Sequence, residues 1–311
     1  MAVAFALLVA VPWVADDYYT GLATKIVILA IFALSLELLV GRTGLVSFGH
    51  AAYFGIGAYA VALASPMDAP AALWWTLPLS MAAAALYALP VGALSLRTRG
   101  IYFIMITLAF AQMAYYVFHD AKFSGGSDGM YMYFRPHAEV AGSEILSIEG
   151  AERFHWFAVG CLAAVFGLLA LMMRSRYGHA LAGIRSNEQR MRAAGFATYP
   201  YKLGAFVLSA AIAGLAGYLY ALKDGFVNPE LLSWHQSGAV LLMIILGGIG
   251  HLRGALLGAV AFTLLHELFQ SEALIGSAAR HWQLWMGLAI IAFVALLPRG
   301  LIGLFERARQ G

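Results

Sequence analysis

Charged side chains are scarce in this chain, and their scarcity decides its broad class. Only 11% of the 311 residues are charged and 62% are apolar, whereas about 25% charged is usual in soluble domains. Residues 43–67 contain no acidic or basic side chain apart from His50, and residues 69–96 contain none. A hydrocarbon core about 30 Å thick is crossed by roughly 20 apolar helical residues. Because comparable apolar windows recur at 100–119, 154–173, 203–222, 231–252 and 281–298, we predict a polytopic protein of the lipid bilayer.

Several chemical motifs are also missing. The chain has one cysteine, Cys161, which excludes an internal disulfide framework and is interpreted as a packing residue. None of the four lysines follows a glycine, so the Gly-Lys-Ser/Thr loop that binds ATP is absent. No zinc-protease motif or metal-ligand spacing occurs. We therefore expect no enzyme activity, metal or cofactor in this chain, and a net charge of only +3 gives little support for nucleic-acid binding.

An all-α bundle is the expected fold, because spanning helices satisfy their own backbone hydrogen bonds. We expect a single transmembrane domain over residues 1–311. It should hold about ten membrane segments, near 2–15, 22–40, 44–64, 71–95, 101–118, 154–173, 203–222, 237–249, 255–268 and 282–297. The first segment lacks a basic start and precedes Asp16 and Asp17, which favours a short or truncated helix over a cleaved signal peptide.

The basic residues are distributed unevenly between the connections. With alternating crossings, one side collects thirteen of the nineteen basic residues and only two acidic ones, Glu188 and Glu306. The thirteen are Arg42, Arg97, Arg99, Arg174, Arg176, Arg185, Arg190, Arg192, Lys202, Arg253, Arg299, Arg307 and Arg309. The other side holds five basic and twelve acidic residues. Because the cytoplasmic side of a membrane protein carries the excess of arginine and lysine, we place the first side, with both termini, in the cytoplasm.

Residues 237–268 allow either one long tilted helix or two short helices joined at the glycine-rich turn 247–254. A single crossing would place Arg299, Arg307 and Arg309 outside, whereas a hairpin returns them to the cytoplasmic side. We therefore predict a broken pair, in which the piece 237–249 is short enough to be re-entrant instead of spanning.

The predicted cytoplasmic connection, about residues 174–202, carries the signals of an ordered helix. Ser186 and Gln189 have the spacing of a capping box, which predicts a helix over 187–194 that Gly195 ends. Positive-inside charge alone would explain the arginines but not a capped helix, which suits the binding of a cytosolic partner. The candidate coupling contacts are Arg185, Ser186, Asn187, Glu188 and Arg192, with Ile184, Met191 and Phe196 as apolar contacts.

The predicted external loop, about residues 119–153, is acidic and contains the turn-forming cluster Ser124, Gly125, Gly126, Ser127 and Asp128. Two interpretations remain open. The loop is a solvated connector, or this cluster is part of a docking surface for an external partner that delivers a solute.

Polar residues at membrane depth are candidate contacts of a transported solute, because an ionised side chain there is costly unless it faces protein or water. Glu37 is the strongest, and a structural ion pair with Arg42 is the alternative. Residues 44–58 are rich in glycine and alanine, which suits both tight helix packing and an unwound entrance at 44–49 that binds polar cargo. The candidates along a solute path are Glu37, Ser47, His50, Thr107 and Gln112, and His266 and Glu267 also lie within apolar spans.

Five motifs of the chain occur together in a fixed order. The first three are Gly-Leu-Val-Ser-Phe-Gly-His-Ala-Ala-Tyr-Phe-Gly-Ile-Gly-Ala-Tyr at 44–59, the segment 96–112, and Ser-Gly-Gly-Ser-Asp-Gly at 124–129. The others are Gly-His-Ala-Leu-Ala-Gly-Ile-Arg-Ser-Asn-Glu at 178–188 with its continuation to 203, and Leu-Gly-Gly-Ile-Gly at 246–250 followed by Gly-Ala-Leu-Leu-Gly-Ala at 254–259. Together they resemble a known family, the branched-chain amino acid permeases of bacterial ABC transporters, in particular the LivM-type subunit, which has threonine where this chain has Ser124.

The resemblance implies a permease domain that imports branched-chain amino acids or a related small polar solute through a bacterial inner membrane. It also implies a second homologous permease subunit, two cytosolic ATPase subunits that hold ATP and Mg²⁺, and a periplasmic solute-binding protein. One departure is that the importer coupling motif, Glu-Ala-Ala followed by glycine, is represented here only by Arg192-Ala193-Ala194-Gly195. Nothing in the chain selects among branched-chain amino acids, urea, amides and other small acids.

Two hypotheses compete with the importer. One is a stand-alone secondary transporter or channel that uses an ion path between Glu37 and Glu267. The other is a purely structural membrane subunit. Uptake without ATP or an ATPase subunit would identify the secondary transporter.

Overall fold

A computed structural model describes residues 8–13, 16–66, 68–140, 143–146 and 150–303. Residues 8–13 are helical. The helices of the first half are α2 (Asp17–Thr43), α3 (His50–Ala64), α4 (Leu73–Ser95), α5 (Ile101–Asp120), η1 (Lys122–Ser124), η2 (Gly126–Asp128) and α6 (Ala151–Arg174). Those of the second half are α7 (Arg176–Ser186), α8 (Glu188–Ala193), α9 (Thr198–Asp224), η3 (Pro229–Leu232), α10 (Trp234–Gly247), α11 (Leu252–Gln270), α12 (Glu272–Ile275), η4 (Gly276–His281) and α13 (Trp282–Leu296).

Two small antiparallel sheets complete the described part of the chain. Strand β1 (Met130–Tyr131) pairs with β4 (Phe226–Val227), and β2 (Ala138–Val140) pairs with β3 (Ser143–Leu146). Both sheets are too short to form a core. The core is helical, which confirms the predicted all-α class.

Seven of the described helical stretches are long and apolar enough to cross a membrane. They are α2, α4, α5, α6, α9, α11 and the stretch Ala279–Leu296 that contains α13. Two shorter apolar helices, α3 and α10, accompany them. Each predicted segment from 22–40 to 282–297 coincides with one of these nine, whereas the predicted segment 2–15 lies partly outside the described residues. The polytopic class is therefore confirmed.

Helices α2 and α9 form the centre of the bundle. In their most apolar windows 83% and 78% of residues are buried, against 11% in Ala279–Leu296. Helix α3 packs directly on α9, because a Cβ atom added to Gly57 would overlap the backbone of Gly214, and one added to Gly217 would overlap the carbonyl oxygen of Phe54. Small residues let the two backbones approach, so the tight packing predicted for residues 44–58 is confirmed.

The break predicted within 237–268 is also confirmed. Helix α10 ends at Gly247 and α11 begins at Leu252. Between them Gly248 and Gly250 have φ values of +110° and +97°, a conformation that a side chain disfavours. The two helices pack closely, since a Cβ atom at Gly258 would overlap the carbonyl oxygen of Met243. Helix α10 has 14 residues and is therefore only about 21 Å long.

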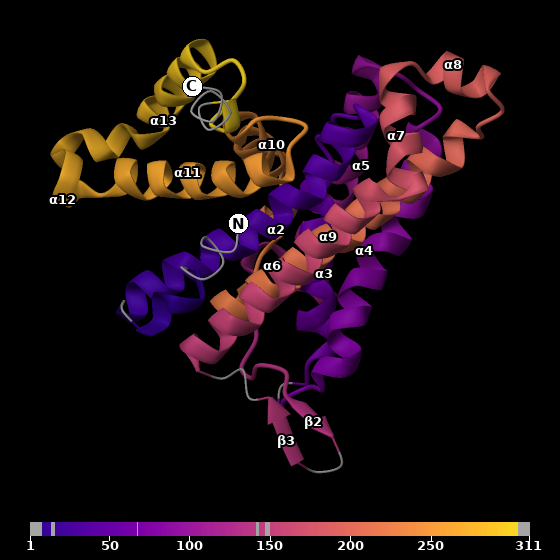
Figure 1. Cartoon of the computed structure of the whole chain (residues 1–311). Helices are drawn as coiled ribbons and strands as arrows, with labels where there is room; N and C mark the ends of the chain where they lie inside the picture. The colour runs from indigo at the N-terminus through magenta and orange to yellow at the C-terminus, as the bar shows by residue number, and fades with distance from the viewer. Residues whose placement is uncertain (1–7, 14–15, 67, 141–142, 147–149, 304–311) are drawn as a thin grey trace.

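The two predicted non-membrane regions lie at opposite ends of the bundle. Figure 1 shows α7 and α8 at one end and the β2–β3 hairpin at the other. At the α7–α8 end, the Tyr199 hydroxyl donates to the carbonyl oxygen of Ala93 at 2.9 Å. At the hairpin end, the Leu73 amide donates to the carbonyl oxygen of His137 at 2.8 Å. These contacts agree with the alternation of crossings on which the predicted orientation rests.

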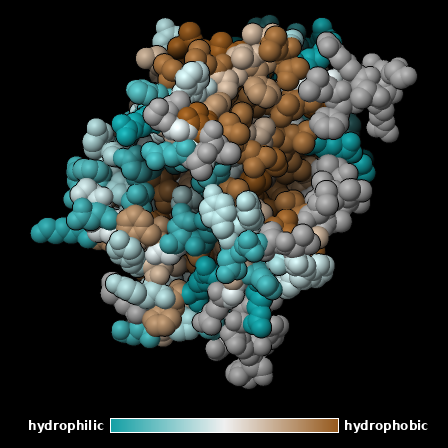
Figure 2. Space-filling model, turned by 90° about the vertical axis from the view of Figure 1, so that its left-hand side faces the viewer, coloured by the Kyte–Doolittle hydropathy of each residue, from teal (hydrophilic) through white to brown (hydrophobic). Residues whose placement is uncertain are grey.

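Apolar side chains remain exposed on the outer helices. Figure 2 shows a broad apolar area on one face, bordered by polar side chains. On α13, Leu284, Leu288 and Ile291 are each more than half exposed. Such a surface suits contact with lipid or with another membrane helix.

Candidate functional site

The connection 174–202 is helical through most of its length. Helix α7 begins after Ser175, whose hydroxyl accepts the Gly178 amide at 3.3 Å. Helix α8 begins after Asn187, whose Oδ1 accepts the Arg190 amide at 2.9 Å. The short helix predicted over 187–194 is therefore present as α8. The predicted capping residue was wrong, because Ser186 belongs to the end of α7 and donates to the carbonyl oxygen of Gly183.

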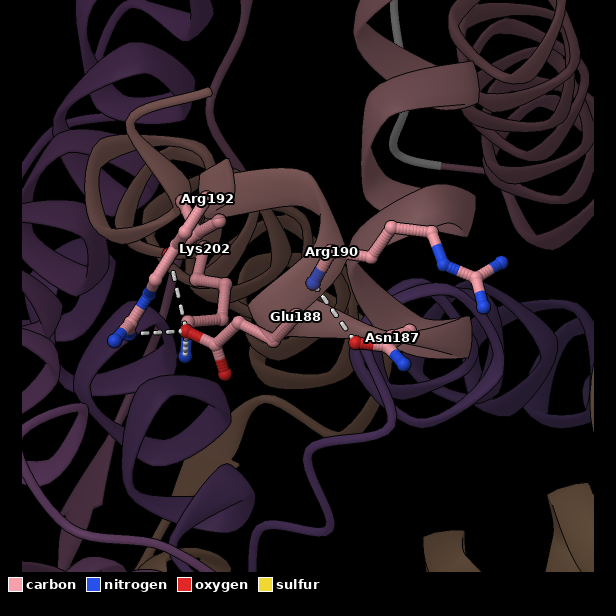
Figure 3. A network of polar contacts seen from close by, with 6 residues as sticks. Asn187, Glu188, Arg190, Arg192 and Lys202 are labelled. Carbon is pink, nitrogen blue, oxygen red and sulfur yellow. Dashed lines mark hydrogen bonds and ion pairs between the residues drawn. The ribbon is translucent and has the colours of Figure 1, made fainter. Parts of the chain in front are cut away.

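Glu188 fastens α8 to the start of α9. Its Oε1 accepts hydrogen bonds from Arg192 at 2.5 Å, Lys202 at 2.9 Å and Thr198 at 3.0 Å (Figure 3). Burial alone would raise the pKa of Glu188, but the hydrogen bonds from Lys202, Thr198 and Arg192 outweigh it and lower the pKa to about 2. The carboxylate is therefore charged at neutral pH. It stabilises the group formed by Glu188, Arg192, Thr198 and Lys202, which we call the Glu188 cluster.

Arg185 links α7 to the membrane bundle. Its Nη1 donates to the carbonyl oxygen of Gly41, near the end of α2. One turn earlier on α2, the fully buried Glu37 accepts the Gly250 amide at 2.6 Å through Oε1. We call these four residues, Glu37, Gly41, Arg185 and Gly250, the Glu37 junction. It joins the connection, the central helix α2 and the α10–α11 turn at one point.

The glycines of the Glu37 junction are required by its close packing. A Cβ atom at Gly41 would overlap Oε1 of Glu37 and would lie 3.2 Å from the Cα atom of Gly250. Gly250 itself has a positive φ of +97°. A side chain at Gly41 would therefore displace either the carboxylate or the turn.

Part of the surface that was predicted to contact a cytosolic partner is buried within the protein. Ile184 is 4% exposed and belongs to the core, so its predicted role as an outward apolar contact was wrong. Asn187 and Arg190 are exposed, and Phe196 is 40% exposed. In Figure 3 the side chain of Arg190 points away from the Glu188 cluster. These residues, with the exposed Ser186, are part of the exposed surface at this end.

Three of the predicted solute-path residues gather at the start of α3. Residues 44–49 are not helical, as predicted, and α3 begins at His50. His50 is buried and its Nε2 lies 2.7 Å from the hydroxyl of Ser35. Ser47 accepts the Gly49 amide at 3.2 Å. The backbone of Thr107 packs so closely on Gly49 that a Cβ atom there would overlap it.

Glu37 and Gln112 do not join this group. Glu37 lies in its junction, and Gln112 is half-buried on α5. The alternative ion path also finds no support. Glu267 pairs with Lys25 at 3.2 Å, and Lys25 precedes Glu37 by twelve residues, which is about 18 Å along α2.

The external cluster divides into buried and exposed residues. Ser124 is buried, and its hydroxyl donates to the carbonyl oxygens of Phe118 and Ala121 at 2.5 and 2.8 Å. Gly125 and Gly126 have positive φ values of +76° and +61°, which the turn requires. Ser127 and Asp128 are exposed. Ser124, Gly125 and Gly126 therefore shape the loop, and Ser127 and Asp128 remain as its surface.

A cavity of about 540 Å³ lies between α2, α3, α9, α10, α11 and α13. None of the five predicted solute-path residues lines it. Its polar lining residues are Lys25, His235, Gln236, Thr263, His266, Tyr220 and Gln283, and its apolar ones are Leu29, Phe32, Phe54, Leu231, Ala239, Met243, Phe262 and Trp282. Lys25 and His266 carried a signal in the sequence, because each is an ionisable residue inside an apolar span. Within the described part of the chain, no group of three or more His, Cys, Asp or Glu side chains is placed to hold a metal ion.

Fold and site together define a helical, multi-pass membrane protein. The Glu37 junction joins its ordered connection 174–202 to the bundle, and a cavity with polar and apolar lining residues lies between its helices. A family model described as branched-chain amino acid transport system / permease component matches residues 18–296, and the chain belongs to this family.

Three curated relatives are similar to the chain in sequence. It is 28% identical to the high-affinity branched-chain amino acid transport system permease protein LivM of Escherichia coli (strain K12), over 95% of this chain and 72% of that protein. The protein of the same name from Salmonella typhimurium is also 28% identical, over 94% of this chain and 72% of the relative. A probable branched-chain amino acid transport permease protein LivM of Methanocaldococcus jannaschii is 22% identical over 48% of this chain and 46% of its own length. No solved structure matches the chain. The predicted resemblance is thus confirmed.

Proposed function

We propose that this chain is a membrane-spanning permease subunit of a bacterial importer that is driven by ATP hydrolysis on separate subunits. Its solute is a branched-chain amino acid or a related small polar molecule. Family membership over residues 18–296 supports the transport role, and the absence of a P-loop supports ATP binding elsewhere. The complete importer would add a second homologous permease, two cytosolic ATPases that hold ATP and Mg²⁺, and a periplasmic solute-binding protein.

In this proposal the chain forms about ten membrane segments in the inner membrane, with both termini in the cytoplasm. The α7–α8 end is cytoplasmic, because the excess of basic residues lies there. The exposed Ser127 and Asp128 then face the periplasm, where the solute-binding protein docks. Helix α10 either spans the membrane or re-enters from one side, and its length of about 21 Å favours the second.

The Glu37 junction is the observation that carries the coupling mechanism. A displacement of α8 by the ATPases is passed to α9 through the Glu188 cluster and to α7 through the chain. Arg185 then moves with α7 and pulls on the end of α2, while Glu37 binds α2 to the α10–α11 turn. Two arrangements of these packed helices, one open to each side, would be shifted in population by the nucleotide state of the ATPases.

Reconstitution tests the function directly. The chain is co-expressed with the second permease and the ATPases and purified as a complex. The complex is placed in vesicles, and the solute-binding protein is added outside them. We expect uptake of leucine, isoleucine or valine only with ATP inside. Equal uptake without ATP, or by this chain alone, would contradict the importer and favour the secondary transporter.

A further inference from the structure

A surface depression of about 430 Å³ lies between the α10–α11 turn and the segment that follows α13, at the predicted cytoplasmic end of the bundle. Its volume is within the range of about 300–1,000 Å³ that is usual for small-molecule sites. Arg299 and His251 are both exposed there, and none of the lining residues is acidic. The lining residues are Ile245, Gly248, Ile249, His251, Pro298, Arg299, Gly300 and Ile302. Their charge favours an anion as the ligand.

Close packing fixes the walls of this depression. The Leu301 amide donates to the carbonyl oxygen of Leu246 at 2.9 Å, which joins the segment after α13 to the end of α10. Gly248 and Gly300 have φ values of +110° and +68°. A Cβ atom on Gly300 would lie only 2.5 Å from the backbone nitrogen of Gly248. The depression is therefore formed before a ligand binds, which lowers the entropic cost of binding.

Arg299 is placed to bind a phosphate group at the membrane surface. No described residue forms an ion pair or a hydrogen bond with its guanidinium group. It directly follows the membrane stretch Ala279–Leu296 and the short link to Pro298, so it lies at the predicted boundary between hydrocarbon and water. A guanidinium group can donate two parallel hydrogen bonds to phosphate oxygens. Basic pockets between membrane helices at the cytoplasmic side are typical sites of anionic lipid headgroups.

An apolar crevice continues the depression along α13 and α10 (Figure 1). Its lining residues are Ile245, Leu246, Phe293, Val294, Leu297, Pro298 and Gly300, of which Ile245, Pro298 and Gly300 also line the depression. Phe293 and Val294 precede Arg299 on α13, so they lie deeper in the predicted span. The crevice has a volume of about 40 Å³ and can hold only a short part of an acyl chain. The exposed Ile291, further along α13, offers an apolar surface for the rest.

We propose that the depression and the crevice together bind one anionic phospholipid. Its phosphate lies on Arg299, and the first part of an acyl chain lies against Phe293 and Val294. A charged group at the surface with an apolar crevice at greater depth matches the order of these parts in a phospholipid. A water-soluble partner would leave the crevice uncovered, and free phosphate would fill only the depression. The site is separate from the proposed solute path, and the inference does not rest on the proposed function.

Photolabelling in vesicles tests the site without a transport measurement. The full chain, alone and within the complete importer, is placed in phosphatidylcholine vesicles with a trace of phosphatidylglycerol that carries a diazirine on one acyl chain. Mass spectrometry should find the label near Phe293 in both preparations. Unlabelled phosphatidylglycerol should compete for this position about tenfold better than phosphatidylcholine, and inorganic phosphate should not compete. Label at the exposed Leu284 reports bulk lipid and should be displaced equally by both lipids.

Two pairs of variants separate the phosphate contact from the chain contact. Arg299→Ala should lower the label near Phe293 at least about tenfold, whereas Arg99→Ala, an exposed arginine at the same end, should not change it. Val294→Trp fills the crevice and should also lower the label. Ile291→Trp, on the same helix but outside the crevice, is its matched control. Val294 and Ile291 are both exposed, so both variants should fold.

Hydrogen exchange gives a second measurement. The bound lipid contacts the α10–α11 turn at Gly248 and Ile249, so amides 248–251 should exchange more slowly in phosphatidylglycerol vesicles than in phosphatidylcholine vesicles. This difference should disappear in Arg299→Ala. A difference of equal size in that variant would contradict phosphate binding by Arg299.

Four results of the labelling would overturn the proposal. They are equal competition by the two lipids, displacement of the label by inorganic phosphate, unchanged labelling in Arg299→Ala, and label in the chain alone but not in the complete importer. The last would show that another subunit covers the depression. Label that appears only after residues 304–311 are deleted would also overturn it, because the chain's own end would then be the occupant.

Discussion

Two carboxylates stabilise the predicted cytoplasmic end, and they do so in different surroundings. Glu188 lies near the surface, with its side chain 22% exposed, and binds two cations and a hydroxyl of α8 and α9. Glu37 is fully buried and binds a backbone amide of the α10–α11 turn. The contacts of Glu188 stay within one connection, so they stiffen it. Those of Glu37 join distant parts of the bundle, so they can transmit its motion.

The largest effect is expected from removing the acceptor at Glu37. Glu37→Leu leaves the Gly250 amide without its buried partner, which should cost about 2–4 kcal/mol in the free energy of unfolding. Titration of mixed micelles with dodecyl sulfate measures this. Glu37→Gln keeps an acceptor oxygen and should cost less than half as much. If leucine and glutamine cost the same, the hydrogen bond to the turn is not what Glu37 contributes.

A smaller and more local effect is expected at the surface cluster. Glu188→Arg places a third cation beside Arg192 and the nearly buried Lys202, and should cost about 1–3 kcal/mol. Hydrogen exchange should accelerate in α8 but not in the α10–α11 turn. The protein should remain inserted, while uptake per ATP falls. Faster exchange in both regions would contradict the conclusion that the contacts of Glu188 act only within the connection.

The surface cluster should also respond to acid. The pKa of Glu188 is about 2 in the folded chain against a usual 4.5. Its stabilisation is therefore complete above pH 4.5 and lost as the pH falls toward 2. Solvent screening limits this contribution to about 1 kcal/mol. Between pH 5 and 3, the unaltered chain should lose α8 protection in hydrogen exchange, and Glu188→Gln, already unprotected, should change little. An equal pH response in both would contradict the depressed pKa.

The smallest effect concerns the start of α8. Asn187→Ala removes its cap and should cost about 1 kcal/mol of local stability. Ser186→Ala removes a bond within the last turn of α7 and should cost less than about 0.5 kcal/mol. Exchange rates of the α8 amides distinguish the two. The reverse order would restore Ser186 as the cap.

Much of the fold could be predicted because local patterns determine it. Apolar runs located the helices. Arg299 and its neighbours indicated the α10–α11 hairpin, because a hairpin returns these arginines to the predicted cytoplasmic side. The cap of α8 was misplaced by one residue, because serine and asparagine have similar capping preferences and stand next to each other at 186 and 187.

The sites are formed by contacts between residues that lie far apart in the sequence. No local sequence pattern contains such contacts. Lys25 and Glu267 are 242 positions apart, and Glu37 and Gly250 are 213 apart. The sequence marked Glu37 and Glu267 as costly at membrane depth, but it could not pair them. It also could not tell that His50 faces Ser35 inside the bundle while the cavity lies beyond Phe32.

The most direct test of the coupling mechanism is the amount of solute imported per ATP hydrolysed by the reconstituted importer carrying Arg185→Ala. This substitution removes the bond from α7 to the carbonyl oxygen of Gly41. Arg99→Ala, an exposed arginine at the same end, is the matched control. We predict that ATP hydrolysis continues in both variants, while import per ATP falls at least about tenfold only in Arg185→Ala. An unchanged ratio in that variant would contradict transmission through the Glu37 junction.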